Sequence, residues 1–369
     1  MKKAFWWNFR PLDTLFISDG TPFQAGEGGL RGQGSLFPPP INTCQGAIRT
    51  ALAYGQGWAP YSGVDLPKEL GSNKHIGDLI LRGPFLSYED ELLFPAPNHI
   101  LAERAGDKTT YHFLEPIMKY RCDLHPEEDR CLPGLKNNIP GVKPVAGWLN
   151  KNDLTKVLAG NLEQITPYQA EDLWARENRI GIEINRETRA AKEQMLYSTF
   201  HIRVKNNVSI SVSVGGLPES WHDDAAAYIN FGGEGRVASI EKRIDNDNHL
   251  PTLAELKRGN GKILFTVSLL THGNFSCDTK EVVLNGPTKW IKGKTITACL
   301  GKAIQIGGWD TIEKESRALM PLIPAGSTWF FEADEEYLSD IEKLHGSSIG
   351  YHTNMGYGQI VIGRWEGIK

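Results

Sequence analysis

The stretch Val208-Ser209-Ile210-Ser211-Val212-Ser213-Val214 decides the fold class, because apolar residues alternate with serine along its whole length. An alternation with period two is typical of a β-strand with one buried face. Asn206-Asn207 precedes it, at the place where a two-residue turn belongs. The sequence therefore predicts a β-hairpin over residues 195–214, with its serine face in water.

Strand patterns and one helix pattern lie on the N-terminal side of this hairpin. Residues 5–16 predict a first strand, and residues 75–86 and 92–94 predict two more. Between them, a helix is expected to begin near Asn42 or Thr43, since either side chain can cap its first turn. Its buried face is predicted from four apolar residues at helical spacing, which are Ala47, Ile48, Ala51 and Leu52.

The C-terminal side again mixes strands with a helix. An acidic helix is predicted at residues 334–344, and strands are predicted at residues 262–270, 295–306, 327–332 and 359–365. This succession favours an α+β fold, in which helices cover one face of a sheet.

Residues 95–172 are rich in proline, glycine, asparagine and charge, and their periodicity is weak. We interpret them as a long insertion or protruding loop with a short helix near residues 153–158. The chain has 369 residues, which is too long for one core of ordinary size, so two domains are expected.

Composition narrows the class of protein. The first residues do not resemble a signal peptide, and no apolar stretch is as long as a membrane helix. Five cysteines are typical of a reducing compartment, so a cytoplasmic location is expected. The formal net charge of −4 argues against a uniformly basic nucleic-acid binder. Positive charge is local instead, because residues 176–205 hold seven Lys or Arg against four Glu.

Three glycine-rich turns, at residues 26–34, 232–235 and 346–358, are candidates for binding phosphate. Glycine lets backbone N–H groups approach phosphate oxygens, because no Cβ intervenes. No Lys-Ser or Lys-Thr pair follows these glycines, which argues against a Walker-type nucleotide site. Aromatic rings of the third turn are candidates for stacking on bases, and they belong to Tyr351, His352 and Tyr357.

Five groups of residues, in order along nearly the whole chain, carry a family resemblance. They are Pro11-Leu12-Asp13-Thr14-Leu15-Phe16 with Asp19-Gly20-Thr21-Pro22-Phe23, Phe37-Pro38-Pro39-Pro40 with Gly46-Ala47-Ile48-Arg49, Arg179-Ile180-Gly181-Ile182-Glu183-Ile184-Asn185 with Thr188-Arg189, Gly232-Gly233-Glu234-Gly235-Arg236, and Asn354-Met355-Gly356-Tyr357-Gly358. With these motifs the chain resembles the third subunit of the Cmr complex, the type III-B CRISPR effector, in the RAMP superfamily.

The resemblance implies two ferredoxin-like (RRM-like) domains and a C-terminal glycine-rich loop. We expect the N-terminal domain at residues 1–245, with the inserted region at about 95–172, and the C-terminal domain at residues 246–369. The resemblance also implies a non-catalytic RNA-binding subunit that needs no cofactor. Such a subunit would hold the 5′ tag of the guide RNA and contact the first part of the duplex between guide and target RNA. Its protein partners would be the large palm-domain polymerase subunit and the backbone RAMP subunit.

Two positions depart from the pattern of the family. Thr21 replaces the arginine of the usual Asp-Gly-Arg-Pro-Phe turn, so it is not counted as a phosphate contact. Asn185 replaces an aspartate, which removes a carboxylate and keeps hydrogen-bonding capacity. The predicted RNA-binding residues combine cations for phosphates, polar side chains for bases, and glycines that shape the surface. They are Arg31, Arg49, Arg179, Asn185, Arg186, Arg189, Lys192, Arg236, His352, Asn354, Gly356 and Gly358.

Three other interpretations stay open. A metal-dependent RAMP endoribonuclease would use Asp19, although this aspartate also suits a purely structural role in its turn. Cys122, His125 and Cys131 are a weak candidate for a zinc site, because the usual Cys-x-x-Cys pairs are missing. A scaffold that binds only proteins is the third interpretation, and the acidic helix at residues 334–344 would suit its interface.

Overall fold

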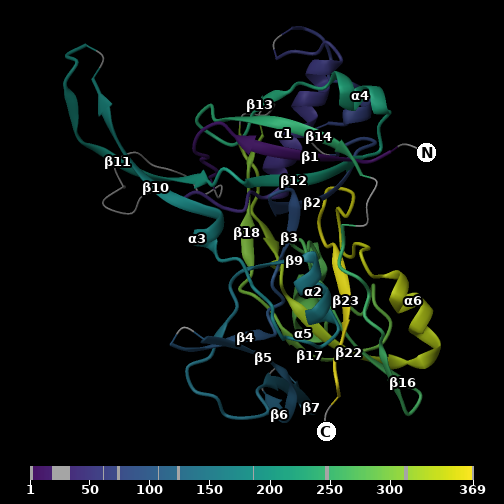
Figure 1. Ribbon diagram of the computed structural model, residues 1–369. Helices are drawn as coiled ribbons and strands as arrows, with labels where there is room; N and C mark the ends of the chain where they lie inside the picture. The colour runs from purple at the N-terminus through teal and green to yellow at the C-terminus, as the bar shows by residue number, and fades with distance from the viewer. Residues whose placement is uncertain are drawn as a thin grey trace. The chain divides into compact units, whose positions relative to one another are not determined.

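The chain folds into two compact units, each built from discontinuous segments (Figure 1). Unit 1 comprises Met1–Asp90, Ala170–Asn246 and Gln305–Met320, and unit 2 comprises Glu91–Gln169, Asp247–Ile304 and Pro321–Lys369. The computed structural model describes residues 3–18, 34–60, 62–72, 75–106, 108–122, 125–185, 187–245, 249–310 and 315–367, with the backbone alone for 118–119, 121–130, 183, 191–197 and 309–310. The predicted inserted region at about 95–172 falls largely in unit 2, while the predicted domain boundaries stay a prediction.

Unit 1 is built on antiparallel strands in the order β13-β14-β1-β12-β2. Trp7 and Phe9 of β1 are fully buried in its core. Helix α1 covers this core, and its predicted buried residues are indeed buried. The elements are β1 (Phe5–Pro11), α1 (Ile41–Gly55), β2 (Ile80–Tyr88), β12 (Val208–Gly215), α4 (Glu219–Asp224), β13 (Tyr228–Asn230) and β14 (Val237–Ile244).

Strand β12 contradicts the predicted hairpin at residues 195–214. It pairs with β1 and β2, whereas the preceding strand β11 (Ala191–Val204) pairs with β10 (Trp174–Ile184). All eight residues of β12 are buried, so its serine face is not in water. The hydroxyl groups are satisfied by cross-strand hydrogen bonds instead: Ser209 to Ser87 at 2.6 Å, and Ser211 to Asn8 at 2.7 Å. An alternating pattern therefore predicted the strand correctly but not its partner or its solvent exposure.

Unit 2 contains a sheet in the order β15-β16-β22-β17, with β23 also paired to β16. Its core gathers large apolar side chains, among them Phe265, Trp329, Phe331 and Ile362. The predicted acidic helix is present, and its Ile341 is buried. The elements are β15 (Lys257–Gly259), β16 (Lys262–Leu269), α5 (Thr279–Asn285), β17 (Lys294–Cys299), β22 (Thr328–Asp334), α6 (Leu338–Lys343) and β23 (Ile360–Arg364).

Strands occupy much of the region that the sequence suggested to be a loop. The predicted short helix is confirmed as α2 (Lys151–Leu158), and the side chain of Asn150 caps it by accepting the Asp153 N–H at 2.8 Å. The strands are β3 (Glu91–Pro95), β4 (Ile100–Ala105), β5 (Lys108–Phe113), β6 (Glu115–Cys122), β7 (His125–Gly134), β8 (Lys143–Pro144) and β9 (Trp148–Asn150).

The remaining elements are short. In the part of the chain that the structure describes, no helix has the length and apolar character needed to cross a membrane. The short elements are η1 (Lys68–Leu70), α3 (Ala170–Leu173), β18 (Ile304–Ile306), β19 (Trp309–Asp310), β20 (Glu315–Ser316), β21 (Met320–Leu322), η2 (Ser276–Asp278) and η3 (Glu335–Tyr337).

Candidate nucleic-acid interface

The β10–β11 hairpin carries most of the predicted RNA-binding residues of unit 1. Its strands pair from Trp174 opposite Val204 at the base to Ile184 opposite Ala191 near the tip. Figure 1 shows this two-stranded ribbon projecting from the sheet of unit 1. A two-stranded ribbon without a third strand has little stability of its own, so its long extension favours a role in contacting a partner.

The tip of the hairpin is closed by Asn185. Its side-chain oxygen accepts the N–H of Glu187 at 2.9 Å and the N–H of Thr188 at 3.3 Å. The amide function at this position therefore shapes the turn. Arg189 follows in the left-handed region, with φ of 53°, and its side chain is exposed. Of the other predicted contacts, Arg186 and the side chain of Lys192 lie outside the described residues.

Three isoleucines form an exposed apolar ladder along β10. Ile180, Ile182 and Ile184 are 68%, 47% and 56% exposed. Ile180 and Ile182 lie two residues apart in regular pairing and so share one face of the strand, while the register shifts between Ile182 and Ile184. Exposed isoleucines in a row are unusual in a soluble protein and indicate a contact surface. This ladder was not predicted from the sequence, although its signal, Ile-x-Ile-x-Ile, is present at residues 180–184.

A network of ion pairs lies at the base of the hairpin. Asp13 accepts hydrogen bonds from Arg179 at 3.4 Å, Arg203 at 3.2 Å and Arg236 at 2.9 Å. Glu177 accepts from Arg179 and Arg203, at 2.9 and 2.7 Å. The structure thus brings together two predicted RNA-binding arginines, Arg179 and Arg236, although they are far apart in sequence.

The charges of this network are balanced internally. Glu234 pairs with Arg236 at 3.5 Å and with the buried His201 at 3.2 Å, so three arginines face three carboxylates. Burial lowers the pKa of His201, which is therefore neutral at pH 7. Hydrogen bonds from Arg203 and Arg179 lower the pKa of Glu177. Because a guanidinium group has five donors, each arginine can keep its carboxylate and still bind a phosphate.

Arg49, another predicted phosphate contact, is held within unit 1. Its Nη2 donates to the backbone oxygen of Ser72 at 2.9 Å, and burial lowers its pKa. Two further positions lie outside the described residues, namely Arg31 and Asp19.

The glycine-rich turn at residues 232–235 has a structural role. Gly232 has φ of 87°, and a Cβ there would lie 2.6 Å from the backbone oxygen of Phe16. The N–H of Gly233 donates to that same oxygen at 2.7 Å. This turn therefore fixes the chain just before Arg236 and sets where its guanidinium group lies.

In the C-terminal turn at residues 346–358 some side chains are exposed, but backbone N–H groups of its glycines already donate hydrogen bonds within the protein. The N–H of Gly356 donates to the Thr353 oxygen at 3.2 Å, and the N–H of Gly358 donates to the His272 oxygen at 2.9 Å. His352 and Asn354 are exposed, so the predicted base contacts are accessible there. Tyr357 is 1% exposed, so the expectation that its ring stacks on bases is wrong.

Tyr351 of the same turn belongs to a second polar cluster. Its hydroxyl donates to Asp278 at 2.9 Å, and Lys289 donates to both groups, at 2.8 and 2.9 Å. The Lys289 ammonium group also lies over the Tyr351 ring, 5.3 Å from its centre. Hydrogen bonds from Lys289 and Tyr351 lower the pKa of Asp278. Sequence reasoning missed Lys289, which is 60% exposed and adds a cation beside the turn.

The weak zinc candidate stays a prediction. Cys131 is partly buried, but the side chains of Cys122 and His125 lie outside the described residues. Among the residues that are described, no group of three His, Cys, Asp or Glu side chains is arranged to hold a metal ion.

Comparison with known proteins identifies the class to which this fold belongs. The chain matches the family described as CRISPR-associated protein (Cas_Cmr3) over residues 7–365. It is therefore a CRISPR-associated protein. Within that class it belongs to the Cas_Cmr3 family, which confirms the resemblance to the third Cmr subunit.

Two solved structures share the fold. A chain in the cryo-EM structure of the Type III-B Cmr-beta bound to cognate target RNA is 16% identical, with a TM-score of 0.53, and the match covers 97% of this chain and 96% of that one. A chain of the complex bound to cognate target RNA and AMPPnP is 17% identical, with a TM-score of 0.51 and coverage of 89% and 86%. The search of curated proteins found no match. The shared fold is mixed α/β, mostly antiparallel strands with few helices.

Proposed function

We propose that this protein is a non-catalytic RNA-binding subunit of a type III-B CRISPR effector complex. It holds the 5′ tag of the guide RNA and contacts the first part of the guide–target duplex. Membership in the Cas_Cmr3 family supports this role, as does a fold shared with chains of complexes bound to target RNA. In this proposal the two domains are ferredoxin-like, and the C-terminal glycine-rich loop contacts the tag through His352 and Asn354.

The exposed isoleucine ladder is the observation that carries the proposal. Apolar side chains on a narrow projecting element can enter between neighbouring base pairs and unstack them. Ile180, Ile182 and Ile184 have this placement, since they point to solvent along β10. Arg189 at the tip supplies a cation for a phosphate next to the inserted side chains. The hairpin therefore suits contact with a duplex better than contact with a flat protein surface.

The partners follow from the same role. The guide RNA and the target RNA occupy the hairpin, and the palm-domain polymerase subunit and the backbone RAMP subunit flank this chain in the assembly. The non-catalytic character rests on the family resemblance. A cleavage assay with Mg²⁺ on the wild-type protein and the Asp19→Ala variant tests it, because cleavage that depends on Asp19 would establish the endoribonuclease instead.

The central experiment uses the assembled complex with Ile180, Ile182 and Ile184 all changed to serine. We expect assembly with guide RNA to be unchanged. Affinity for target RNA should fall about tenfold or more, because fully burying one isoleucine side chain contributes about 1.5–3 kcal/mol. A 2-aminopurine base in the first part of the duplex should lose the fluorescence increase that accompanies unstacking.

The matched control is Ile80→Ser, since Ile80 is also an exposed isoleucine of unit 1, at 50%. This control should leave both affinity and fluorescence unchanged. Unchanged target affinity and fluorescence in the triple variant would contradict the proposed duplex contact and would favour the scaffold that binds only proteins.

A further inference from the structure

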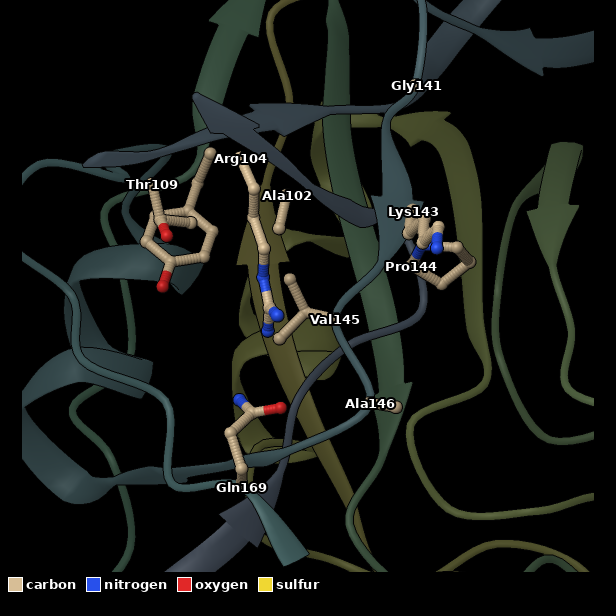
Figure 2. Close-up of a pocket in the computed structure, with 10 residues that line it drawn as sticks. Ala102, Arg104, Thr109, Gly141, Lys143, Pro144, Val145, Ala146 and Gln169 are labelled. Carbon is tan, nitrogen blue, oxygen red and sulfur yellow. The ribbon is translucent and has the colours of Figure 1, made fainter. Parts of the chain in front are cut away.

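Unit 2 contains an open cavity of about 390 Å³, and none of the residues that line it is among the predicted RNA-binding residues. It lies against the three-stranded sheet formed by β5, β4 and β8. Figure 2 shows the Arg104 side chain reaching into this cavity towards Gln169, beside Val145. The lining residues combine cations, hydroxyl groups and small apolar side chains: Ala102, Arg104, Thr109, Tyr111, Gly141, Lys143, Pro144, Val145, Ala146 and Gln169.

The register of the sheet gathers the polar residues on one face. Arg104 pairs with Thr109, and Ala102 pairs with Tyr111 on one side and with Lys143 on the other. Because directly paired residues point to the same face, Thr109, Tyr111 and Lys143 share the face of Arg104.

The carboxylate of the same hairpin lies on the opposite face. Glu103 pairs there with His112 at 2.9 Å, so it does not neutralise the cavity. The two faces of β4 and β5 thus differ in charge, and the positive one faces the cavity.

The cations of the cavity are available to a ligand. Within the residues that the structure describes, neither Arg104 nor Lys143 forms an ion pair, and both are exposed. The carboxylate that acts electrostatically on Tyr111 is Asp153, which is already bound by Lys156 at 3.0 Å and by the Thr166 N–H at 2.9 Å. Burial raises the pKa of Tyr111, so its hydroxyl stays protonated and can donate a hydrogen bond.

We propose that this cavity binds a nucleoside 5′-phosphate. Arg104 and Lys143 hold the phosphate, since guanidinium and ammonium groups are the usual partners of phosphate oxygens. Tyr111 and the apolar wall formed by Pro144 and Val145 contact the ribose and the base. The volume lies at the lower end of the range for small-molecule sites, which suits one nucleotide rather than a longer RNA segment. The nucleotide is either free in solution or the 5′-phosphorylated end of an RNA strand.

Isothermal titration calorimetry on the full-length chain tests the site, with 5′-AMP, adenosine and inorganic phosphate as probes. We expect 5′-AMP to bind more tightly than either of the other two, because both the phosphate and the nucleoside contribute. Arg104→Gln should weaken 5′-AMP binding about tenfold, the loss of one charge-assisted contact. Lys143→Gln should also weaken 5′-AMP binding. It is the variant to measure if Arg104→Gln does not fold.

Lys108→Gln is the matched control, because Lys108 is an exposed cation of the same hairpin that pairs with Ala105 and so lies on the opposite face. It should leave 5′-AMP binding unchanged. An equal loss in Lys108→Gln and Arg104→Gln would overturn the site in favour of general electrostatic attraction. Absence of 5′-AMP binding, together with no preference for a phosphorylated RNA end, would also overturn it.

The source of the nucleotide is distinguished with a short RNA carrying either a 5′-phosphate or a 5′-hydroxyl. Tighter binding of the phosphorylated RNA that is lost in Arg104→Gln identifies an RNA end as the ligand. Binding of 5′-AMP with no such RNA preference identifies a free nucleotide. Both results are independent of the isoleucine ladder, whose variants leave this cavity intact.

Discussion

Asp13 accepts hydrogen bonds from three arginines, and the lowered pKa of its carboxyl provides a test of this network. The Thr14 N–H and then Arg179 and Arg203 lower the pKa of this carboxyl from 3.8. A lowered folded-state pKa means that the carboxylate stabilises the fold above pH 3.8 and that this contribution is lost as pH falls through the lower value. The side chain is 49% exposed, so solvent screening keeps the contribution small.

We therefore expect Asp13→Asn to lower the melting temperature by about 2–4 °C at pH 7. The difference from wild type should shrink as pH falls below 3.8 towards the lowered pKa of this carboxyl, because protonation removes the charge from the network. Thermal melts followed by circular dichroism at pH 7, 5 and 3 measure this. A difference of equal size at pH 7 and pH 3 would show that the charge of Asp13 is not what stabilises the network.

Arg189 differs from the arginines at the base of the hairpin, which are paired with carboxylates. It is exposed at the tip and forms no ion pair with any described residue. Arg189→Ala should therefore weaken guide-RNA binding by the assembled complex and reduce the slope of log K against log salt by about one. Arg243→Ala is the control, because Arg243 is already paired with Glu241 and Asp90. Filter binding between 50 and 200 mM salt measures both, and equal slopes for the two variants would rule out a phosphate contact at Arg189.

At the scale of elements, the aromatic residues of the C-terminal turn differ in burial, so one has a structural role and another is accessible to RNA. Tyr357 is fully buried, so Tyr357→Ala should cost about 3–5 kcal/mol in the free energy of unfolding. His352 is exposed, so His352→Ala should leave stability unchanged and weaken binding of the 5′-tag RNA in the complex. Urea unfolding and filter binding give the two readouts. The interpretation fails if His352→Ala destabilises the protein as much as Tyr357→Ala.

Sequence patterns predicted where helices and strands form better than they predicted which strands pair with one another. Helix α1 was predicted with its buried face, because helical spacing of Ala47, Ile48, Ala51 and Leu52 is a local property. The pairing of β11 with β10 could not be derived, since a period of two shows that a strand forms but not which strand lies beside it. The strands of residues 95–172 were missed for a related reason, because strands with mixed polarity lack clear alternation of apolar and polar residues.

The candidate site was predictable only where its residues are neighbours in sequence. The positive charge of residues 176–205 is visible along the chain, and it led to Arg179 and Arg189. The neutralising contact between Arg236 and Asp13 joins residues 223 positions apart, so no local pattern reveals it. Burial of Tyr357 depends on the turn folding back on its own unit, which the glycine spacing alone does not determine.

For the whole molecule, the net charge of −4 and the balanced network predict that RNA binding depends on assembly. Among the described residues of its predicted contact surface, most arginines are already paired with carboxylates. The isolated chain should therefore bind 5′-tag RNA only with the affinity of non-specific contacts, about 10⁻⁴–10⁻⁶ M at physiological salt. In the proposed complex the RNA would also be held by partner subunits, so affinity should rise at least about a hundredfold, as expected for contacts that act together in one assembly. Filter binding with the isolated chain and with the complex compares the two affinities, and hydrogen exchange at residues 187–190 should be slower in the complex with RNA than in the isolated chain. Equal affinity for the isolated chain would mean that this protein alone holds the tag, and the partners would then be needed for the duplex contact only.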